Sequence, residues 1–216
     1  MKGINAVLVN RVDSLKKVIE KQDETRIARH LDDLIKNDSF LKSWLTIVAT
    51  QARKDKRTRK KSNIYKTIST LIEVLQPILI RKKVNVKLID DGQLIERRIF
   101  KSDFESIIYN LIINSIEAFE RCIRDKRKII VSMSADDDYI YIQYDDNGPG
   151  ISELFSDPYE IFIYGTTSKK DKDGNDIGTG MGMYIVASTL REYNATYNIT
   201  NIKNGFGLNI KIPRGV

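Results

Sequence analysis

Residues 109–120 read YNLIINSIEAFE, a stretch that combines a helical apolar pattern with two asparagines on one face. Asn110, Asn114, Glu117 and Arg121 are spaced by four, three and four residues, so a helix places them on the same side. Asparagine is a weak helix former, which makes this pair unusual. A carboxamide oxygen is a suitable ligand for Mg²⁺, which shares substrate phosphate oxygens. The alternative is two solvated asparagines. The expected buried stripe consists of Phe104, Ile107, Ile108, Leu111, Ser115, Ala118, Phe119 and Cys122.

A second segment, YDDNGPGI (144–151), follows an alternating stretch that predicts a strand. Gly148 and Gly150 allow a tight turn against which a flat ligand can rest. Asp145 or Asp146, at the end of the strand, could accept a hydrogen bond from an exocyclic amine. The alternative is a simple β-turn, because DNG and PG are common turn sequences.

A third segment, GTTSKKDKDGNDIGTGMGMYIV (165–186), is rich in glycine and opens a helix with GTGMG. Backbone N–H groups of a glycine loop and a helix N-terminus form an anion site suited to polyphosphate. Further donors and positive charge come from Thr166, Thr167, Ser168, Lys169 and Lys170. The polar segment around Gly174 is typical of a mobile lid. The glycine spacing does not match the dinucleotide-binding fingerprint.

The order of these three segments resembles the ATP-binding superfamily that includes DNA gyrase, the ninety-kilodalton chaperone, histidine kinases and mismatch-repair ATPases. The resemblance covers roughly residues 64–214. Hydrolysing members carry a glutamate general base four residues before the Mg²⁺-binding asparagine, whereas this chain has Asn110 there. NLIINSIEA looks like the histidine-kinase version, NLLxNAxxA. IFIYGTTSK (161–169) also resembles the segment before the lid of these kinases, although SDPYEI is unusual there.

The resemblance implies that ATP and Mg²⁺ are the ligands of the site. It assigns Asn110 and Asn114 to the ion and the phosphates, with Asn114 as the Mg²⁺ ligand. It assigns Asp146 to adenine and Gly148 and Gly150 to the base pocket. Phosphoryl transfer to an imidazole needs positioning and charge neutralisation more than a strong base, which makes an asparagine at position 110 acceptable. The other implied ATP-binding residues are Thr166, Thr167, Lys169, Gly178, Thr179, Gly180, Met181 and Gly182.

The pattern from about residue 62 predicts an α+β fold, a two-layer α/β sandwich with helices on one face of a mixed sheet. The DG turn at 91–92 predicts a hairpin of 84–90 and 94–100. The acidic turn ADDD predicts a second hairpin of 128–134 and 139–145. Helices are expected over 63–81, with a kink or break at Pro77, over 104–123 and over 181–193, and the last strands near 195–202 and 206–212.

Residues 1–61 have an all-helical pattern that is interrupted by NDS at 37–39. Two helices with one apolar stripe each predict a helical hairpin that needs a partner, and a homodimer would form a four-helix bundle. The predicted domains are therefore a dimerisation-like hairpin over 1–61 and an ATP-binding domain over 62–216.

His30 is the only histidine of the chain. In the kinases that the chain resembles, the first helix of such a hairpin carries the histidine that accepts phosphate, and His30 is the only residue that could do so here. ETRIARHLDD (24–33) resembles the acceptor segment E-R-x-R-I-A-R-E-L-H-D of one subfamily, but Asp32 occupies the position of the acceptor histidine. The alternative is an ordinary helix residue beside Ile27, Leu31 and Leu34. Both interpretations stay open.

The net charge of +7 lies in the N-terminal segment, because residues 1–61 carry +8 and the rest −1. RKDKRTRKK (53–61) is typical of a solvated helix end, and binding of nucleic acid is the less favoured alternative because no aromatic residue is interleaved. The single cysteine, Cys122, excludes an intrachain disulfide and suits a reducing compartment. No apolar run could span a membrane and no signal peptide is recognised, so we expect a cytoplasmic chain without membrane contact.

The predicted function is that of a signalling histidine kinase, which binds Mg-ATP and transfers the γ-phosphate to a histidine. Its expected partners are a second copy of the chain, through residues 1–61, and a response regulator or other protein. One alternative is a nucleotide-responsive binding module, or a fragment of a larger ATPase or kinase, without its own phosphoacceptor. An ATP hydrolase of the gyrase or chaperone type is less favoured because of Asn110.

Overall fold

The computed structural model of the chain describes residues 58–214, apart from 93–94, 124 and 170–179. His30 and the predicted hairpin up to residue 57 lie outside the described residues, as do Gly178 and Thr179. The described elements are, in chain order, β1 (Lys60–Asn63), α3 (Ile64–Arg81), β2 (Val84–Asp90), β3 (Glu96–Ile99), α4 (Lys101–Glu120), β4 (Arg127–Ala135), β5 (Tyr139–Asp146), the 3₁₀ helix η1 (Pro158–Phe162), α5 (Gly182–Glu192), β6 (Thr196–Asn201) and β7 (Gly207–Pro213).

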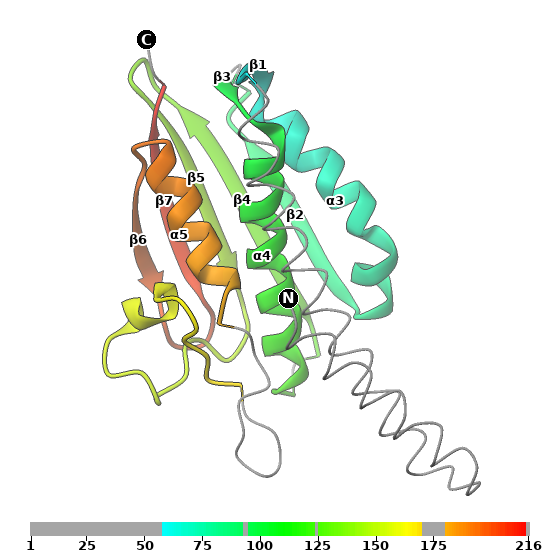
Figure 1. Cartoon of the computed structure of the whole chain (residues 1–216). Coiled ribbons are helices and arrows are strands. Elements are labelled where there is room, and N and C mark those ends of the chain that lie inside the picture. The colour runs from blue at the N-terminus through cyan, green and yellow to red at the C-terminus, as the bar shows by residue number, and fades with distance from the viewer. Residues whose placement is uncertain (1–57, 93–94, 124, 170–179, 215–216) are drawn as a thin grey trace, which may run out of the picture. The chain divides into compact units, whose positions relative to one another are not determined.

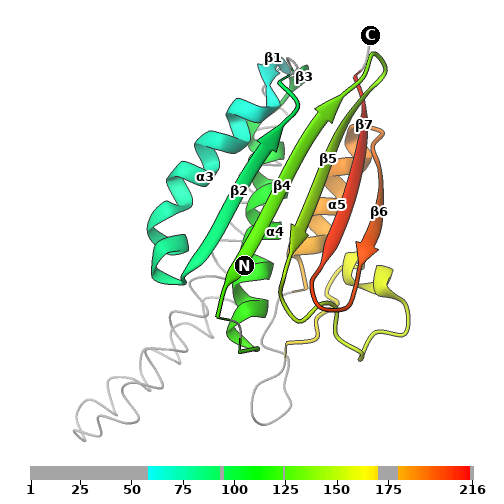
Figure 2. The ribbon, with the colours of Figure 1, turned by 180° about the vertical axis from the view of Figure 1, so that it is seen from behind.

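Five strands form one mixed sheet in the order β2-β4-β5-β7-β6. β2 and β4 are parallel, and the other neighbours are antiparallel. Figure 1 shows α3, α4 and α5 side by side over one face, and Figure 2 shows the opposite face, which none of these helices covers. The predicted two-layer α+β fold, with helices on one face of a mixed sheet, is therefore confirmed.

Helix α4 is the central helix of the layer and packs against both α3 and α5. Most of its predicted stripe is buried, but Ala118 and Cys122 are only half-buried. Ile112 and Ile116, which lie outside the predicted stripe, are buried as well. Because α4 has a helix on each side and the sheet beneath it, it buries a wider face than a helix packed against one partner.

The segments 84–90 and 94–100 do not form the hairpin that the DG turn predicts, so this prediction is wrong. β2 instead pairs in parallel with β4 along its whole length, and β3 pairs with β1 in a separate two-stranded sheet. Ile95, directly before β3, and Ile99, the last residue of β3, are fully buried. A turn dipeptide is a local signal, and the burial of apolar side chains elsewhere decides which partner a strand takes.

The three predicted helices and the last two strands lie where the sequence predicts them, with small shifts at their ends, whereas the sequence predicts no helix at η1. α3 continues through Pro77 to its end, so this proline does not terminate the helix. The predicted hairpin of 128–134 and 139–145 is confirmed as β4 and β5. The prediction of helix through residue 61 is wrong at Lys60 and Lys61, whose backbone pairs with β3. None of the described helices is long and apolar enough to cross a membrane.

Tyr193, which follows α5, attaches the end of this helix to the start of α4. Its side chain is fully buried, and its hydroxyl donates to Asp103 Oδ2 at 2.7 Å and accepts from the Phe100 N–H at 3.0 Å. The guanidinium groups of Arg59 and Arg97 lie 4.5 and 5.1 Å from the ring centre, within the range of cation–π attraction. Burial, helped by the Asp103 carboxylate, raises the pKa of Tyr193 and keeps the hydroxyl protonated.

Replacing Tyr193 by phenylalanine is expected to lower the free energy of unfolding by about 2 kcal/mol, because Asp103 and the Phe100 N–H each lose a buried hydrogen bond. Urea denaturation of the full chain, followed by circular dichroism, measures the change. Tyr164→Phe at an exposed tyrosine is the matched control and should have little effect.

The same variant also tests the direction of the pKa shift. Because the pKa of Tyr193 is raised in the folded protein, its stabilisation is complete below the unfolded pKa of about 10 and is lost as the pH rises above it. Tyr193→Phe should therefore lose less stability than the wild type on going from about pH 9 to about pH 11. Equal stability of the two proteins at neutral pH would contradict the anchoring role of the hydroxyl.

Candidate functional site

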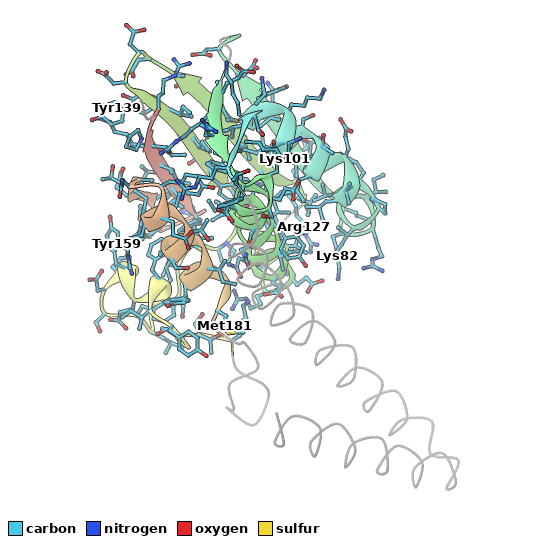
Figure 3. The ribbon with its side chains drawn as sticks, turned by 45° about the horizontal axis from the view of Figure 1, so that its top comes forward. Lys82, Lys101, Arg127, Tyr139, Tyr159 and Met181 are labelled. Atoms are coloured by element: carbon cyan, nitrogen blue, oxygen red, sulfur yellow. The ribbon has the colours of Figure 1, made fainter. Side chains whose placement is uncertain are left out.

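The three sequence motifs meet at one end of the domain. The C-terminal end of α4 lies at the same end of the domain as the end of β5 and the start of α5 (Figure 1). In Figure 3, Met181, directly before α5, marks this end, and Tyr139, the first residue of β5, lies at the opposite end. The asparagines, the end of β5 and the glycine loop are thus brought together from positions far apart in the sequence.

The first turn of α5 lies directly on the asparagine face of α4. A Cβ atom on Gly182 would lie 3.1 Å from Asn110 Oδ1 and 3.4 Å from Asn114 Nδ2. Asn110 is oriented by its own helix, because its Nδ2 donates to the Ser106 carbonyl oxygen at 2.7 Å. The first N–H groups of a helix have no partner within it, so this junction combines backbone donors with amide side chains.

The chain that precedes the predicted lid packs against the chain that follows it. Gly180 has a φ of +61°, and a Cβ there would lie 2.2 Å from the carbonyl carbon of Gly165 and 2.5 Å from the backbone nitrogen of Thr166. The N–H of Gly165 donates to the carbonyl oxygen of Gly180 at 3.2 Å. Gly180 is therefore required both for its backbone conformation and for this close approach.

Asp146, at the end of β5, is held by three hydrogen-bond donors. Ser115 Oγ donates to its Oδ2 at 2.5 Å, and the N–H groups of Gly148 and Phe206 donate to its Oδ1 at 2.8 and 3.2 Å. Asp145 makes its side-chain contact elsewhere, with Gln143 Nε2. Of the two aspartates that the sequence leaves open, Asp146 is the one that points towards α4.

Ser115 and Tyr144 support Asp146, and sequence reasoning did not identify either as part of the site. The Tyr144 hydroxyl lies 2.7 Å from Ser115 Oγ and, since Ser115 donates to Asp146, it donates to Ser115. Burial and the nearby Asp146 charge raise the pKa of Tyr144 well above its ordinary value, so it remains a donor. A serine within an apolar buried stripe was the available signal, because a buried hydroxyl needs a partner.

The two glycines after β5 have different roles. A Cβ on Gly148 would lie 3.0 Å from Asp146 Oδ1 and 3.6 Å from Phe119 Cε1, so a side chain here would crowd the carboxylate. Gly150 has a φ of +91°, and its Cβ would lie 2.2 Å from the Ile202 carbonyl oxygen. Gly148 leaves space beside Asp146, whereas Gly150 allows the loop to pack against the segment between β6 and β7.

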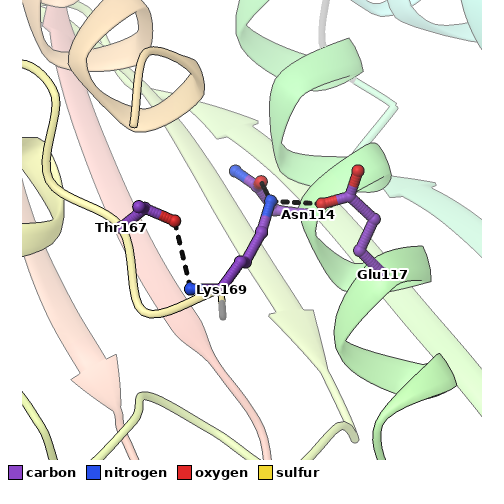
Figure 4. A network of polar contacts seen from close by, with 4 residues as sticks. All are labelled: Asn114, Glu117, Thr167 and Lys169. Carbon is purple, nitrogen blue, oxygen red and sulfur yellow. Dashed lines mark hydrogen bonds and ion pairs between the residues drawn. The ribbon is translucent and has the colours of Figure 1, made fainter. Parts of the chain in front are cut away.

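Lys169 reaches across to α4, as Figure 4 shows. Its ammonium forms an ion pair with Glu117 and lies 3.4 Å from Asn114 Oδ1. Its backbone N–H donates to Thr167 Oγ1 at 3.1 Å. The neighbouring Thr166 donates its N–H to the Ile163 carbonyl oxygen at 3.2 Å. The structure thus brings Lys169 to Asn114 and adds Glu117, which the sequence places on the asparagine face without assigning it a role.

The oxygen atoms of this region suit a metal ion that arrives with a polyphosphate. No group of three or more His, Cys, Asp or Glu side chains that could hold a metal occurs among the described residues. Mg²⁺ needs few protein ligands, however, since it keeps several waters and binds substrate phosphates. Asn114 Oδ1 and the adjacent Glu117 carboxylate are hard oxygen groups of the kind that it accepts.

Replacing Ser115 by alanine is expected to lower the free energy of unfolding by about 1–3 kcal/mol, because Asp146 loses a donor and the buried Tyr144 hydroxyl loses its acceptor. Thermal or urea denaturation measures the change. Ser69→Ala on α3, where the hydroxyl contacts Glu73 at an exposed position, is the matched control. Equal effects of the two substitutions would contradict a supporting role for Ser115.

Comparison with curated proteins finds a relative along the whole chain. The sensor histidine kinase GlnK of Bacillus subtilis (strain 168) is 28% identical over 218 residues, which cover 99% of this chain and 47% of that protein. The chain therefore spans about half the length of this relative.

Solved structures share the fold at low sequence identity. Acinetobacter baumannii histidine kinase AdeS matches with a TM-score of 0.66 at 14% identity, covering 100% of this chain and 97% of that one. Histidine kinase ThkA, in a crystal structure with the response regulator protein TrrA, matches with a TM-score of 0.65 at 15% identity, covering 98% and 60%. The catalytic domain of ThkA matches with a TM-score of 0.59 at 18% identity, covering 72% and 95%.

A family model describes the part of the chain that contains α4, β5, α5 and the loops between them. It matches residues 100–215, more than half of the chain, and this stretch includes both asparagines, Asp146 and the glycine loop. The chain belongs to the family of histidine kinase-, DNA gyrase B- and HSP90-like ATPases.

Proposed function

We propose that the chain binds ATP together with Mg²⁺ at this site and transfers the γ-phosphate to a histidine, as part of a signalling histidine kinase. The observation that carries the proposal is the contact between the start of α5 and the asparagine face of α4, where Gly182 lies against Asn110 and Asn114. Backbone donors, amide oxygens and the Lys169 ammonium converge there, which is the set of groups that a metal-bound polyphosphate requires.

Asp146 is proposed to bind the base. A carboxylate held by three donors keeps a fixed orientation, and its remaining acceptor capacity suits the exocyclic amine of adenine. Gly148 leaves the space beside the carboxylate without a side chain. Asp146 would therefore select the base, while the Lys169 ammonium and the backbone groups at the start of α5 would contact the phosphates.

Asn114 is proposed as the protein ligand of Mg²⁺, and the ion, when bound, neutralises charge on the phosphates. Asn110 would act on the phosphates or on the waters of the ion, with its amide oriented by the Ser106 carbonyl. Gly180, Met181 and Gly182 would place backbone groups against the phosphates. We extend the same role to Thr166, Thr167, Gly178 and Thr179, of which the last two lie outside the described residues.

Asn110 favours phosphoryl transfer over hydrolysis of ATP. A carboxamide does not take up a proton near neutral pH, so it cannot replace the glutamate base that hydrolysing members carry at this position. An imidazole acceptor is itself a nucleophile and needs positioning more than deprotonation. Phosphate release without a phosphorylated protein would favour the hydrolase alternative instead.

The acceptor within the chain would be His30, and the partners would be a second copy and a response regulator. His30 is the only histidine of the sequence. Dimerisation through residues 1–61 would form the four-helix bundle on which it lies. ThkA, which shares the fold, has been crystallised with a response regulator, and this supports a partner of the same kind here. The alternative is a nucleotide-responsive module whose acceptor lies on another protein.

Asn114→Ala is expected to weaken the binding of ATP in the presence of Mg²⁺ by about tenfold or more, since a metal ligand is lost. Gly182→Ala should weaken it as well, because the added Cβ would lie 3.1 Å from Asn110 Oδ1 and displace this amide. Calorimetric titration measures the affinities. Asn198→Ala, at an exposed position of β6, is the matched control, and unchanged affinity in Asn114→Ala would exclude the proposed ion site.

Incubation with γ-labelled ATP and Mg²⁺ tests the transfer step. The wild-type chain should acquire acid-labile label, as expected of a phosphohistidine, and His30→Gln should acquire none. Calorimetry on the same variant should show unchanged ATP binding, because His30 is proposed as the acceptor and not as a nucleotide ligand. ATP binding without label on the wild type would instead favour the module that lacks its own acceptor.

A further inference from the structure

Lys169 lies between two groups of α4 that both attract cations. Its ammonium is paired with the Glu117 carboxylate and lies 3.4 Å from Asn114 Oδ1 (Figure 4). The two charged side chains are partly screened from water, with 29% of Lys169 and 42% of Glu117 exposed. The ammonium thus contacts the same amide oxygen that is proposed to bind Mg²⁺.

The Lys169 ammonium and a magnesium ion cannot both contact Asn114 Oδ1. Both are cations, and at a distance of a few ångströms they repel each other strongly in a partly buried site. Mg²⁺ also demands close contact with its oxygen ligands. Binding of Mg²⁺ at Asn114 therefore requires the Lys169 ammonium to leave that oxygen.

The backbone of Lys169 and the residues before it makes hydrogen bonds, and the flexible lysine side chain is the part that can exchange partners. The Lys169 N–H bonds to Thr167 Oγ1, and Gly165 bonds to the Gly180 carbonyl oxygen at the other side of the glycine loop. These contacts fix the backbone from which the long lysine side chain extends to α4. Released from Glu117, the ammonium has phosphate oxygens as its alternative partner.

The carboxylate of Glu117 opposes a polyphosphate when no metal is present. It carries the same sign as the phosphates, and it also engages the cation that could bind them. With Mg²⁺ bound, Asn114 would hold the ion and the Lys169 ammonium would be available to the phosphates. Asn114 would exchange the ammonium for the metal ion, and Lys169 would exchange Glu117 for phosphate. Each group thus replaces one charge-assisted contact by another. The Glu117–Lys169 ion pair therefore disfavours nucleotide binding without the metal and does not prevent it when the metal is present.

We propose that Glu117 is a positioning residue that holds Lys169 on Asn114 until Mg²⁺ displaces it, and that this exchange makes nucleotide binding at the site depend on Mg²⁺. The proposal rests on the proposed function, because it assumes that the site binds Mg-ATP. It adds that Lys169 is an internal substitute for the metal ion and that Glu117 controls when Lys169 becomes available to phosphate.

The test is a double-mutant cycle on the full chain with two residues and two metal conditions. ATP affinity is measured by calorimetry in excess Mg²⁺ and in excess chelator for the wild type, Glu117→Gln, Lys169→Gln and the double variant. Glu117→Gln should strengthen Mg²⁺-free binding by about three- to fivefold, as expected for releasing a partly exposed ion pair, and should change Mg²⁺-bound affinity less. In the Lys169→Gln background the same substitution should change Mg²⁺-free affinity by less than about twofold.

Two further variants serve as controls. Glu120→Gln removes a carboxylate from the same helix, but Glu120 is paired with Lys82. This control should leave the ratio of the two affinities unchanged. Lys169→Arg keeps the positive charge and should retain most of the Mg²⁺ dependence, whereas a purely structural role for Lys169 predicts no such rescue.

An equal gain from Glu117→Gln with and without Lys169 would overturn the proposal, because it would show simple repulsion of phosphate by Glu117. No gain in either background would overturn it as well. If the wild type binds no ATP with Mg²⁺, or if Asn114→Ala binds it equally well, the proposed function itself fails and the inference fails with it. If Asn114→Ala loses ATP binding but the effects of Glu117→Gln and Lys169→Gln are additive, the proposed function stands and only the exchange between Lys169 and Mg²⁺ is overturned.

Discussion

The close contact between the first turn of α5 and the asparagine face of α4 is the constraint on which the site depends. With glycine at position 182, no side chain separates the start of α5 from Asn110 and Asn114, and at 180 the backbone conformation also demands glycine. These residues place the N–H groups of a helix start beside amide side chains. Without this approach, α4 would present two asparagines to water, which is the alternative that its sequence allows.

The opposite end of α5 is fixed by a different kind of contact, and the two ends together hold the helix along α4. Tyr193 is buried and bonds to Asp103 at the start of α4, and it also contacts Arg59 and Arg97. Because α4 and α5 pack side by side, this anchor and the glycine contact determine the same alignment. A shift of α5 along α4 would disturb both the Tyr193 contacts and the contact of Gly182 with the asparagines. A substitution near Tyr193 can therefore alter the site by changing the position of α5.

Local sequence patterns predicted most of the helices and strands. They failed where the conformation or pairing of a segment depends on residues far away in the sequence. The apolar period of α4, the hairpin of β4 and β5 and the helix after GTGMG were predicted, since each depends on residues close in sequence. The predicted DG hairpin was wrong because β2 pairs with β4 and β3 pairs with β1. The burial of Ile95 and Ile99 stabilises the observed pairing more than a two-residue turn favours the hairpin. The prediction of a helix was likewise wrong at Lys60 and Lys61, which form a strand because they pair with β3.

The candidate site shows the same division between local and distant information. Asn110 and Asn114, Asp146 and the glycines could be selected from motif order, but Ser115 and Tyr144 lie on different elements and only the fold shows that their hydroxyls support Asp146. Glu117 and Lys169 are 52 residues apart, so no periodicity relates them. Their pairing changes the interpretation of Asn114: its oxygen has a cation partner within the chain, and binding an external cation is then an exchange and not a simple addition.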